Sequence, residues 1–199
     1  MTALLYAVMQ ADGTTEAGTG LEDRPLRSVT HQRLRAVVSD HDTAPPPEVE
    51  NLWAYEETVE RLMESGPLLP ARFGTTAAQD AELEAMLRER HEELLRTLEH
   101  VGSAVELAIR PAPTEAVESP QSGTEYMRGR LAQERQAEEL ERATAPLVRA
   151  QTRLANSARA YLVERRHVSE FVAEASALGL TITGPWPPYS FVAEEAAAS

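Results

Sequence analysis

The sequence predicts an α+β protein made of two small domains, and three observations lead to that prediction. Short apolar or alternating runs, typical of strands, are interspersed with amphipathic segments typical of helices, an order found in α/β and α+β sandwiches. These patterns are interrupted near Gly102, which divides the chain into residues 1–102 and residues 103–199. Hydrophobic residues make up 42% and charged residues 26% of the chain, close to the globular average, so both parts are expected to fold.

Two short strands are predicted before the first helix. Residues 4–9 form an apolar run bounded by the turn-rich residues 11–20, a pattern that favours a buried strand. Residues 34–39 repeat this pattern in a shorter form. The stretch 40–47 then breaks regular structure, because its three consecutive prolines lack backbone N–H groups and have fixed φ angles.

An amphipathic helix is predicted over residues 48–65, where apolar side chains recur at spacings of three and four. A glycine and a proline follow directly and end it. Residues 68–73 are a short strand candidate, which Pro70 restricts to a sheet edge or a bulge. The helix side chains expected to face inward are Leu52, Tyr55, Val59, Leu62 and Met63.

A second helix is predicted to begin at a capping box in residues 76–79 and to end at Gly102. One apolar stripe runs along it, and charged side chains occupy much of the remainder. Such a charged face is typical of a solvated surface, the alternative being a docking surface for a basic partner. The stripe consists of Leu83, Met86, Leu87, Leu94, Leu98 and Val101.

The second half of the chain is predicted to follow the order β-α-β-α-β. Residues 104–109 alternate as a strand does, and residues 111–122 form a proline-rich, acidic linker or loop. A long polar helix is expected over residues 124–156, kinked or divided by Pro146. The remaining elements are a strand at 161–163, a short helix at 168–175 and a strand at 180–183. The long helix is expected to turn Met127, Leu131, Leu140, Leu147 and Leu154 inward.

Charge and composition exclude several classes of function. The formal net charge is -13 and the pI is near 4.9, which opposes binding to nucleic acid or to anionic lipid and favours a basic or apolar partner. The chain contains no Cys, which excludes disulfides and thiol chemistry and fits a reducing cytoplasm. No apolar run approaches the roughly 18 residues that a membrane span needs, so we expect no span.

The motifs of common active sites are missing. A zinc-hydrolase helix needs a second histidine four residues after His91, and leucine stands there instead. The glycine-containing stretch 13–20 lacks the Lys-Ser/Thr of a phosphate-binding loop. Adjacent glutamates lie in polar helical stretches where their pKa values need not be perturbed. We therefore predict no enzyme, no catalytic residue, no metal and no cofactor.

Two segments depart from ordinary globular sequence. Residues 66–75, GPLLPARFGT, place Arg72 and Phe73 at the end of a strand candidate, where Arg72 either pairs with an acid or contacts a partner. Residues 183–192, TGPWPPYSFV, favour an extended conformation that displays aromatic side chains to a partner, unless these fold back over the chain's own sheet. The candidate partner-binding or interface residues are Arg72, Phe73, Trp186, Tyr189 and Phe191.

Five blocks of sequence, taken in order, resemble the GvpL/GvpF family of gas vesicle accessory proteins across nearly the whole chain. They are GPLLPARFGT, then VELAIR at 105–110, GTEYMRGR at 123–130, AYLVERRHVSEF at 160–171, and TGPWPPYSFV. The terminal GPWPPYSF is the most specific of them.

This resemblance implies a non-enzymatic helper of gas vesicle assembly, in the cytoplasm and at the vesicle. It implies an N-terminal α+β domain, a ferredoxin-like C-terminal domain with a Pro/aromatic tail, and contact with the apolar shell protein and with other accessory proteins. The roles of chaperone, nucleator and minor vesicle component stay open. The alternatives are an intracellular adaptor that uses the tail, or an enzyme with a site between the domains near Arg72 and Tyr161.

Overall fold

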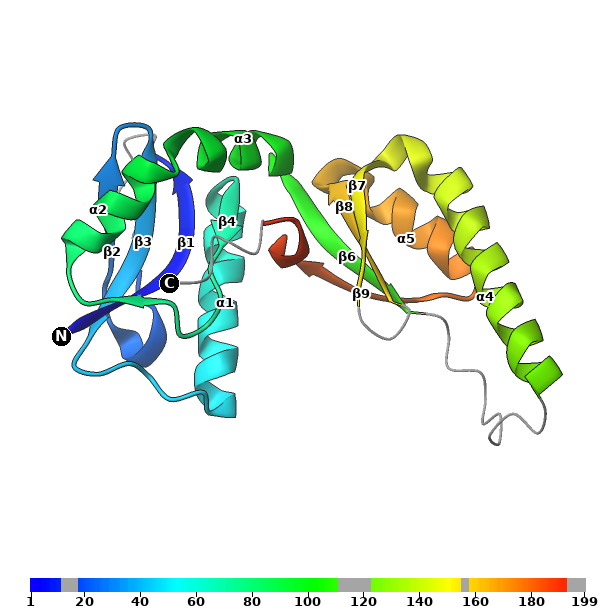
Figure 1. The fold of residues 1–199 in the computed structure, drawn as a ribbon, viewed down its shortest axis with the longest axis horizontal. Coiled ribbons are helices and arrows are strands. Elements are labelled where there is room, and N and C mark those ends of the chain that lie inside the picture. The colour runs from blue at the N-terminus through cyan, green and yellow to red at the C-terminus, as the bar shows by residue number, and fades with distance from the viewer. Residues whose placement is uncertain (12–17, 111–122, 155–157, 193–199) are drawn as a thin grey trace. The chain divides into compact units, whose positions relative to one another are not determined.

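The computed structural model describes residues 1–11, 18–110, 123–154 and 158–192 (Figure 1). They form a mixed α+β fold with two antiparallel sheets, one in each of two compact units. The first unit comprises Met1–Ser103 together with the described residues 187–192, and the second comprises Ala104–Trp186. Much of the predicted turn at 11–20, the whole linker at 111–122 and the end of the predicted long helix lie outside the described residues.

The first sheet has the strand order β2-β3-β1-β4, with β5 also paired to β1. Its strands are β1 (Thr2–Gln10), β2 (Leu26–His31), β3 (Leu34–His41), β4 (Leu68–Pro70) and β5 (Thr76–Ala77). A short 3-10 helix, Leu21–Asp23, precedes β2. The apolar run predicted to form a buried strand is confirmed as β1, which lies inside the sheet and is buried along nearly its whole length.

Helices cover both faces of this sheet, namely α1 (Val49–Ser65), α2 (Asp80–Glu89) and α3 (His91–Val101) (Figure 1). Leu5 of β1 belongs to the core that the leucines of α2 and α3 complete. The next residue, Tyr6, stacks on Tyr55 of α1 with ring centroids 4.9 Å apart. Tyr6 also bonds to Ser39 of β3, whose neighbour Val38 belongs to the core that α2 and α3 complete. Because successive strand residues point to opposite faces, α1 packs on the face opposite to α2 and α3.

Two predictions for this unit are wrong. Thr76 does not cap a helix, because it pairs with Leu4 of β1 as part of β5, and the helix begins at Asp80 instead. The single helix predicted up to Gly102 is two helices separated at Arg90, whose ψ of 16° departs from helical geometry without a glycine or proline to signal it. Strand β2 was not predicted, since only Leu26 and Val29 of it are buried.

The second unit has the element order β-α-β-β-α-β. Its elements are β6 (Ala104–Arg110), α4 (Gly123–Thr144), β7 (Val148–Arg153), β8 (Arg159–Glu164), α5 (Val168–Ala177) and β9 (Thr181–Trp186). Short 3-10 helices at Ala145–Leu147 and Arg165–His167 join α4 to β7 and β8 to α5. The sheet order is β7-β8-β6-β9 and every neighbouring pair is antiparallel. Its core includes Leu107, Ile109, Leu140, Tyr161 and Phe171.

The long helix of this unit is shorter than predicted. It ends at Thr144, and Pro146, which has no N–H to continue the helical ladder, leads into β7. Strand β7 was not predicted, because half-buried and exposed residues alternate along VRAQTR and none of the six is buried. The inward orientation predicted for Met127 and Leu131 is wrong, since they are 56% and 50% exposed.

Strand β9 extends through Pro185, which is tolerated because β9 lies at the sheet edge. Gly184 precedes it with a φ of +115°, and a Cβ there would lie 2.7 Å from the carbonyl oxygen of Glu106. Only glycine therefore fits at that position. A final 3-10 helix, Tyr189–Phe191, belongs to the first unit. Among the described helices, none is both long and apolar enough to traverse a lipid bilayer.

The two compact units differ from the predicted domains at both ends of the second one. Residues 103–199 were assigned together to the second domain, whereas Ser103 and residues 187–192 group with the first unit. The domain boundaries at 1–102 and 103–199 stay a prediction.

Candidate functional site

The candidate site is a hollow of about 530 Å³ on the first unit, beside the N-terminal half of α1. Three segments that are distant in sequence line it: α1, the turn after β4 and the 3-10 helix at Tyr189–Phe191. The lining residues are Val49, Leu52, Trp53, Tyr55, Glu56, Arg72, Phe73 and Tyr189.

The outward-facing residues of α1 give the hollow its apolar character. Positions 49, 52, 53 and 56 follow the spacing i, i+3, i+4, i+7 and therefore share one face of the helix. Val49 is 63%, Leu52 42% and Trp53 68% exposed. A single exposed apolar side chain is ordinary, but a contiguous group that includes tryptophan is typical of an interaction site.

The floor of the hollow is held rigidly by Tyr55. This side chain is only 2% exposed, and its hydroxyl lies 2.8 Å from the carbonyl oxygen of Leu5 and 2.9 Å from that of Ala71, so one proton serves both acceptors. Burial raises the pKa of Tyr55 well above its ordinary value, so the hydroxyl stays protonated. The ring of Phe73 meets that of Tyr55 edge-on at a centroid distance of 5.3 Å, which fixes Phe73 at the wall.

Arg72, next to Phe73 in the chain, also lines the hollow. Its backbone carbonyl accepts the N–H of Thr75 at 3.1 Å and the hydroxyl of Thr75 at 2.8 Å, so the turn is well fixed. Its side chain is exposed, and among the described residues no carboxylate forms an ion pair with it. The structure therefore does not support the interpretation in which Arg72 pairs with an acid at the strand end.

Tyr189 also lines the hollow and forms a hydrogen bond to α1. Its hydroxyl donates to Oε2 of Glu56 at 2.9 Å, across 133 residues of sequence. Burial raises the pKa of the Glu56 carboxyl, the hydrogen bond from Tyr189 opposes that shift, and the charge of Glu60 adds to it. Burial and the neighbouring Glu56 likewise raise the pKa of Tyr189, which keeps its hydroxyl a donor.

Comparison with known proteins identifies the family of the chain. Residues 3–193 match the family described as gas vesicle synthesis protein GvpL/GvpF. The chain belongs to this GvpL/GvpF family. The family resemblance inferred from the five sequence blocks is thereby confirmed.

Individual relatives agree with that assignment. Gas vesicle protein L of Streptomyces sp. (strain CB03234) is 28% identical over 169 residues, and the match spans 64% of this chain and 64% of the relative. Gas vesicle protein F of the same strain is 26% identical over 216 residues, spanning 88% of this chain and 91% of the relative. This GvpL/GvpF member thus resembles both named branches.

Two crystal structures share the fold. That of gas vesicle protein GvpF from Microcystis aeruginosa has a TM-score of 0.75 at 15% identity, covering 96% of this chain and 98% of the other. That of GvpF from Anabaena sp. PCC7120 has a TM-score of 0.73 at 14% identity, with the same coverage. At such identities the likeness concerns the fold alone.

The five predicted interface residues of this GvpL/GvpF member occupy three places. Arg72, Phe73 and Tyr189 line the hollow beside α1. Trp186 lies at the end of β9 in the second unit, opposite Glu106 of β6, and is half-buried. Phe191 lines a second hollow of about 520 Å³ on the first unit, against α3. The sequence did not indicate Val49, Trp53 or Glu56.

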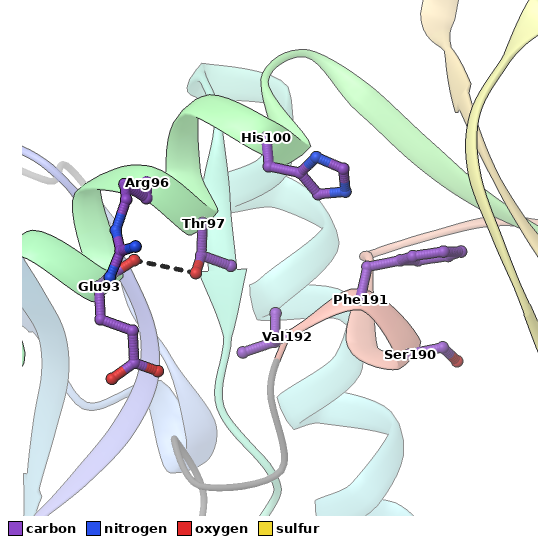
Figure 2. A pocket seen from close by; sticks show the side chains of 7 residues that line it. All are labelled: Glu93, Arg96, Thr97, His100, Ser190, Phe191 and Val192. Atoms are coloured by element: carbon purple, nitrogen blue, oxygen red, sulfur yellow. Dashed lines mark hydrogen bonds between the residues drawn. The ribbon is translucent and has the colours of Figure 1, made fainter.

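The second hollow is where the C-terminal segment lies on the first unit. Figure 2 shows Phe191 and Val192 near His100 and Thr97 of α3. Val192 also packs against the core beneath α2 and α3. Glu93 at its rim is already bonded by Arg90, at 2.6 and 3.0 Å, and this pairing lowers the pKa of Glu93. We therefore interpret this second hollow as the place where residues 190–192 pack on the first unit.

A buried chain of side chains in the first unit resembles a hydrolase triad but is inaccessible. Ser39 Oγ lies 2.8 Å from Nε2 of His41, and Nδ1 of His41 lies 3.2 Å from Oε2 of Glu22. Ser39 has no exposed surface, and its hydroxyl is also 2.8 Å from that of Tyr6. No substrate can reach such a nucleophile. Within residues 1–11, 18–110, 123–154 and 158–192, no cluster of three or more His, Cys, Asp or Glu is suited to a metal ion.

Proposed function

We propose that this GvpL/GvpF member is a non-enzymatic accessory protein that binds the apolar gas vesicle shell protein during assembly, as a chaperone-like helper or as a minor vesicle component. Its family membership supports a role linked to gas vesicles. The single observation that carries the binding role is the exposed apolar hollow beside α1. Other gas vesicle accessory proteins are further partners in this proposal, and the cytoplasm and the vesicle are its places of action.

The hollow suits an apolar protein partner for energetic reasons. A shell subunit with a large apolar face aggregates unless that face is covered. Tryptophan, tyrosine and arginine are the side chains that most often dominate the binding energy of protein interfaces, and Trp53, Tyr189 and Arg72 all line the hollow. The acidic chain, with a net charge of -13, stays dispersed while it holds such a partner.

We further propose that the second unit is a ferredoxin-like domain. Its β-α-β-β-α-β order and its antiparallel sheet order β7-β8-β6-β9 support this assignment. In this proposal the second domain contributes structure, and the tail that follows β9 contributes Tyr189 to the hollow of the first unit.

Co-purification of the shell protein with the tagged full chain tests the proposed function. The wild-type chain is expected to capture the shell protein, and the double variant Leu52→Ser/Trp53→Ser is expected to lose at least nine-tenths of the capture, since hot-spot side chains contribute about 2 kcal/mol or more. The matched control is Met127→Ser, which removes a similarly exposed apolar side chain from α4. Absence of capture by the wild type, or equal losses in both variants, would refute the proposal.

A further inference from the structure

We infer that the hollow beside α1 receives a helix of the partner, apolar on one face and carrying a carboxylate that binds Arg72. This inference rests on the proposed function and specifies which kind of partner segment the hollow recognises.

The shape of the surface favours a helix as occupant. The exposed Val49, Leu52 and Trp53, together with the half-buried Glu56, run along two turns of α1 and form a mostly apolar stripe about 10 Å long. Such a stripe matches the i, i+3, i+4, i+7 face of a second helix laid along it. Phe73 and Tyr189 also line the hollow, so such a helix would contact both rings.

A strand is disfavoured, because the nearest sheet edge offers little to pair with. Strand β4 has only three residues, all of them buried, and it ends at Pro70, which has no N–H. A small ligand is also disfavoured. Pockets for small molecules enclose most of the ligand surface, whereas Val49 and Trp53 are 63% and 68% exposed and leave the hollow wide open.

Among the side chains that line the hollow, Arg72 is the one that favours an anionic group on the partner. The carboxylate of Glu56 already accepts a hydrogen bond from Tyr189, and its pKa is raised by burial, so it is poorly placed to bind a cation. The guanidinium of Arg72 is exposed and forms no ion pair with any described residue. Guanidinium groups bind carboxylates through two parallel hydrogen bonds, so Arg72 provides both attraction and register.

A second copy of this chain is a poorer occupant than a partner helix. Each copy carries a net charge of -13, and the acidic Glu50 and Glu57 lie on the same exposed stretch of α1 as the apolar stripe. Pairing two such faces would bring these carboxylates together, which opposes association.

The test uses overlapping 20-residue peptides that cover the shell protein, with binding to the full chain measured by fluorescence anisotropy. Binding is expected only for peptides that form an amphipathic helix and contain Asp or Glu beside the apolar face. Arg72→Gln is expected to weaken that binding about two- to fivefold, the usual range for an exposed ion pair, and Arg72→Glu to weaken it further. A peptide whose acid is replaced by Lys should bind Arg72→Glu better than wild type.

The outcomes separate this inference from the proposed function. If the intact shell protein co-purifies but Arg72→Glu binds every peptide as the wild type does, the carboxylate assignment is wrong and the proposed function stands. If only non-helical peptides bind, the helix assignment is wrong. If the chain sediments as a dimer that Trp53→Ser dissociates, the hollow is a self-interface and the inference is overturned. Capture of no shell protein by the wild type refutes both proposals.

Discussion

The two faces of α1 use the same kinds of side chain for different purposes. The inner face buries Tyr55, Val59, Leu62 and Met63 against the first sheet. The outer face of the N-terminal half leaves Val49, Leu52 and Trp53 exposed. An ordinary surface helix has one apolar stripe and a polar remainder. These exposed apolar side chains are the observation on which the proposed interaction with the shell protein rests.

The largest expected effect separates the two faces directly. Tyr55→Ala removes a buried ring that packs on Tyr6 and Phe73 and a hydroxyl bound to two carbonyl oxygens, so we expect the free energy of unfolding to fall by about 3–5 kcal/mol. Trp53→Ala, two residues earlier, should change it by less than about 1 kcal/mol. Urea denaturation measures both. Equal losses would show that the outer face is part of the core.

A smaller effect is expected beneath the inner face. The hydroxyl of Tyr6 accepts the backbone N–H of Leu21 at 2.8 Å and lies 2.8 Å from that of Ser39. Tyr6→Phe keeps the ring stack on Tyr55 but leaves the N–H of Leu21 buried without its partner, which costs about 1–3 kcal/mol. Thermal unfolding measures the loss, and capture of the shell protein should be unchanged. Loss of capture at full stability would place Tyr6 in the interaction surface instead.

How much the sequence revealed differs between these faces. Periodicity correctly indicated that Tyr55, Val59, Leu62 and Met63 face inward, but it also placed Leu52 there, and Leu52 is 42% exposed. The pattern identifies apolar positions, and only tertiary packing decides which of them the sheet covers. Trp53 was missed for the same reason.

The candidate site was only partly predictable. Arg72, Phe73 and Tyr189 were selected because their segments are unusual in proline and aromatic content, and all three line the hollow. The bond between Glu56 and Tyr189 joins positions 133 residues apart, and no local spacing signals it. Strand β7 escaped prediction similarly, because its alternating side chains are only half-buried.

A smaller effect is expected for the hydrogen bond between Tyr189 and Glu56 of α1. Tyr189→Phe removes the hydrogen bond to Glu56 and should cost about 1 kcal/mol or less in stability, because the pair is only partly buried. Capture of the shell protein is expected to weaken, since the ring is no longer fixed against α1. The variant Ser190→Ala, at the neighbouring position, serves as the control for the segment. Full capture by Tyr189→Phe would mean that Tyr189 stabilises the tail only.

The smallest expected effect is a change in how stability depends on pH. Burial raises the pKa of Glu56 above its ordinary value of 4.5, so the folded chain binds the Glu56 proton more tightly than the unfolded chain does. Between 4.5 and the raised pKa the folded state therefore carries more protons, and stability falls as pH rises through that window. Above the window the charged carboxylate lowers stability by a constant amount.

Glu56→Gln removes this titration while keeping an oxygen that can accept the hydrogen bond from Tyr189. We expect the variant to be more stable than the wild type at pH 7 by less than about 1 kcal/mol, because Glu56 is half-exposed and solvent screens its charge. The difference should shrink as pH falls through the window toward 4.5. Urea denaturation across this range measures it. A variant less stable than the wild type at pH 7 would mean that the charged carboxylate strengthens the bond to Tyr189 by more than its burial costs, and that the polar wall of the hollow stabilises the fold.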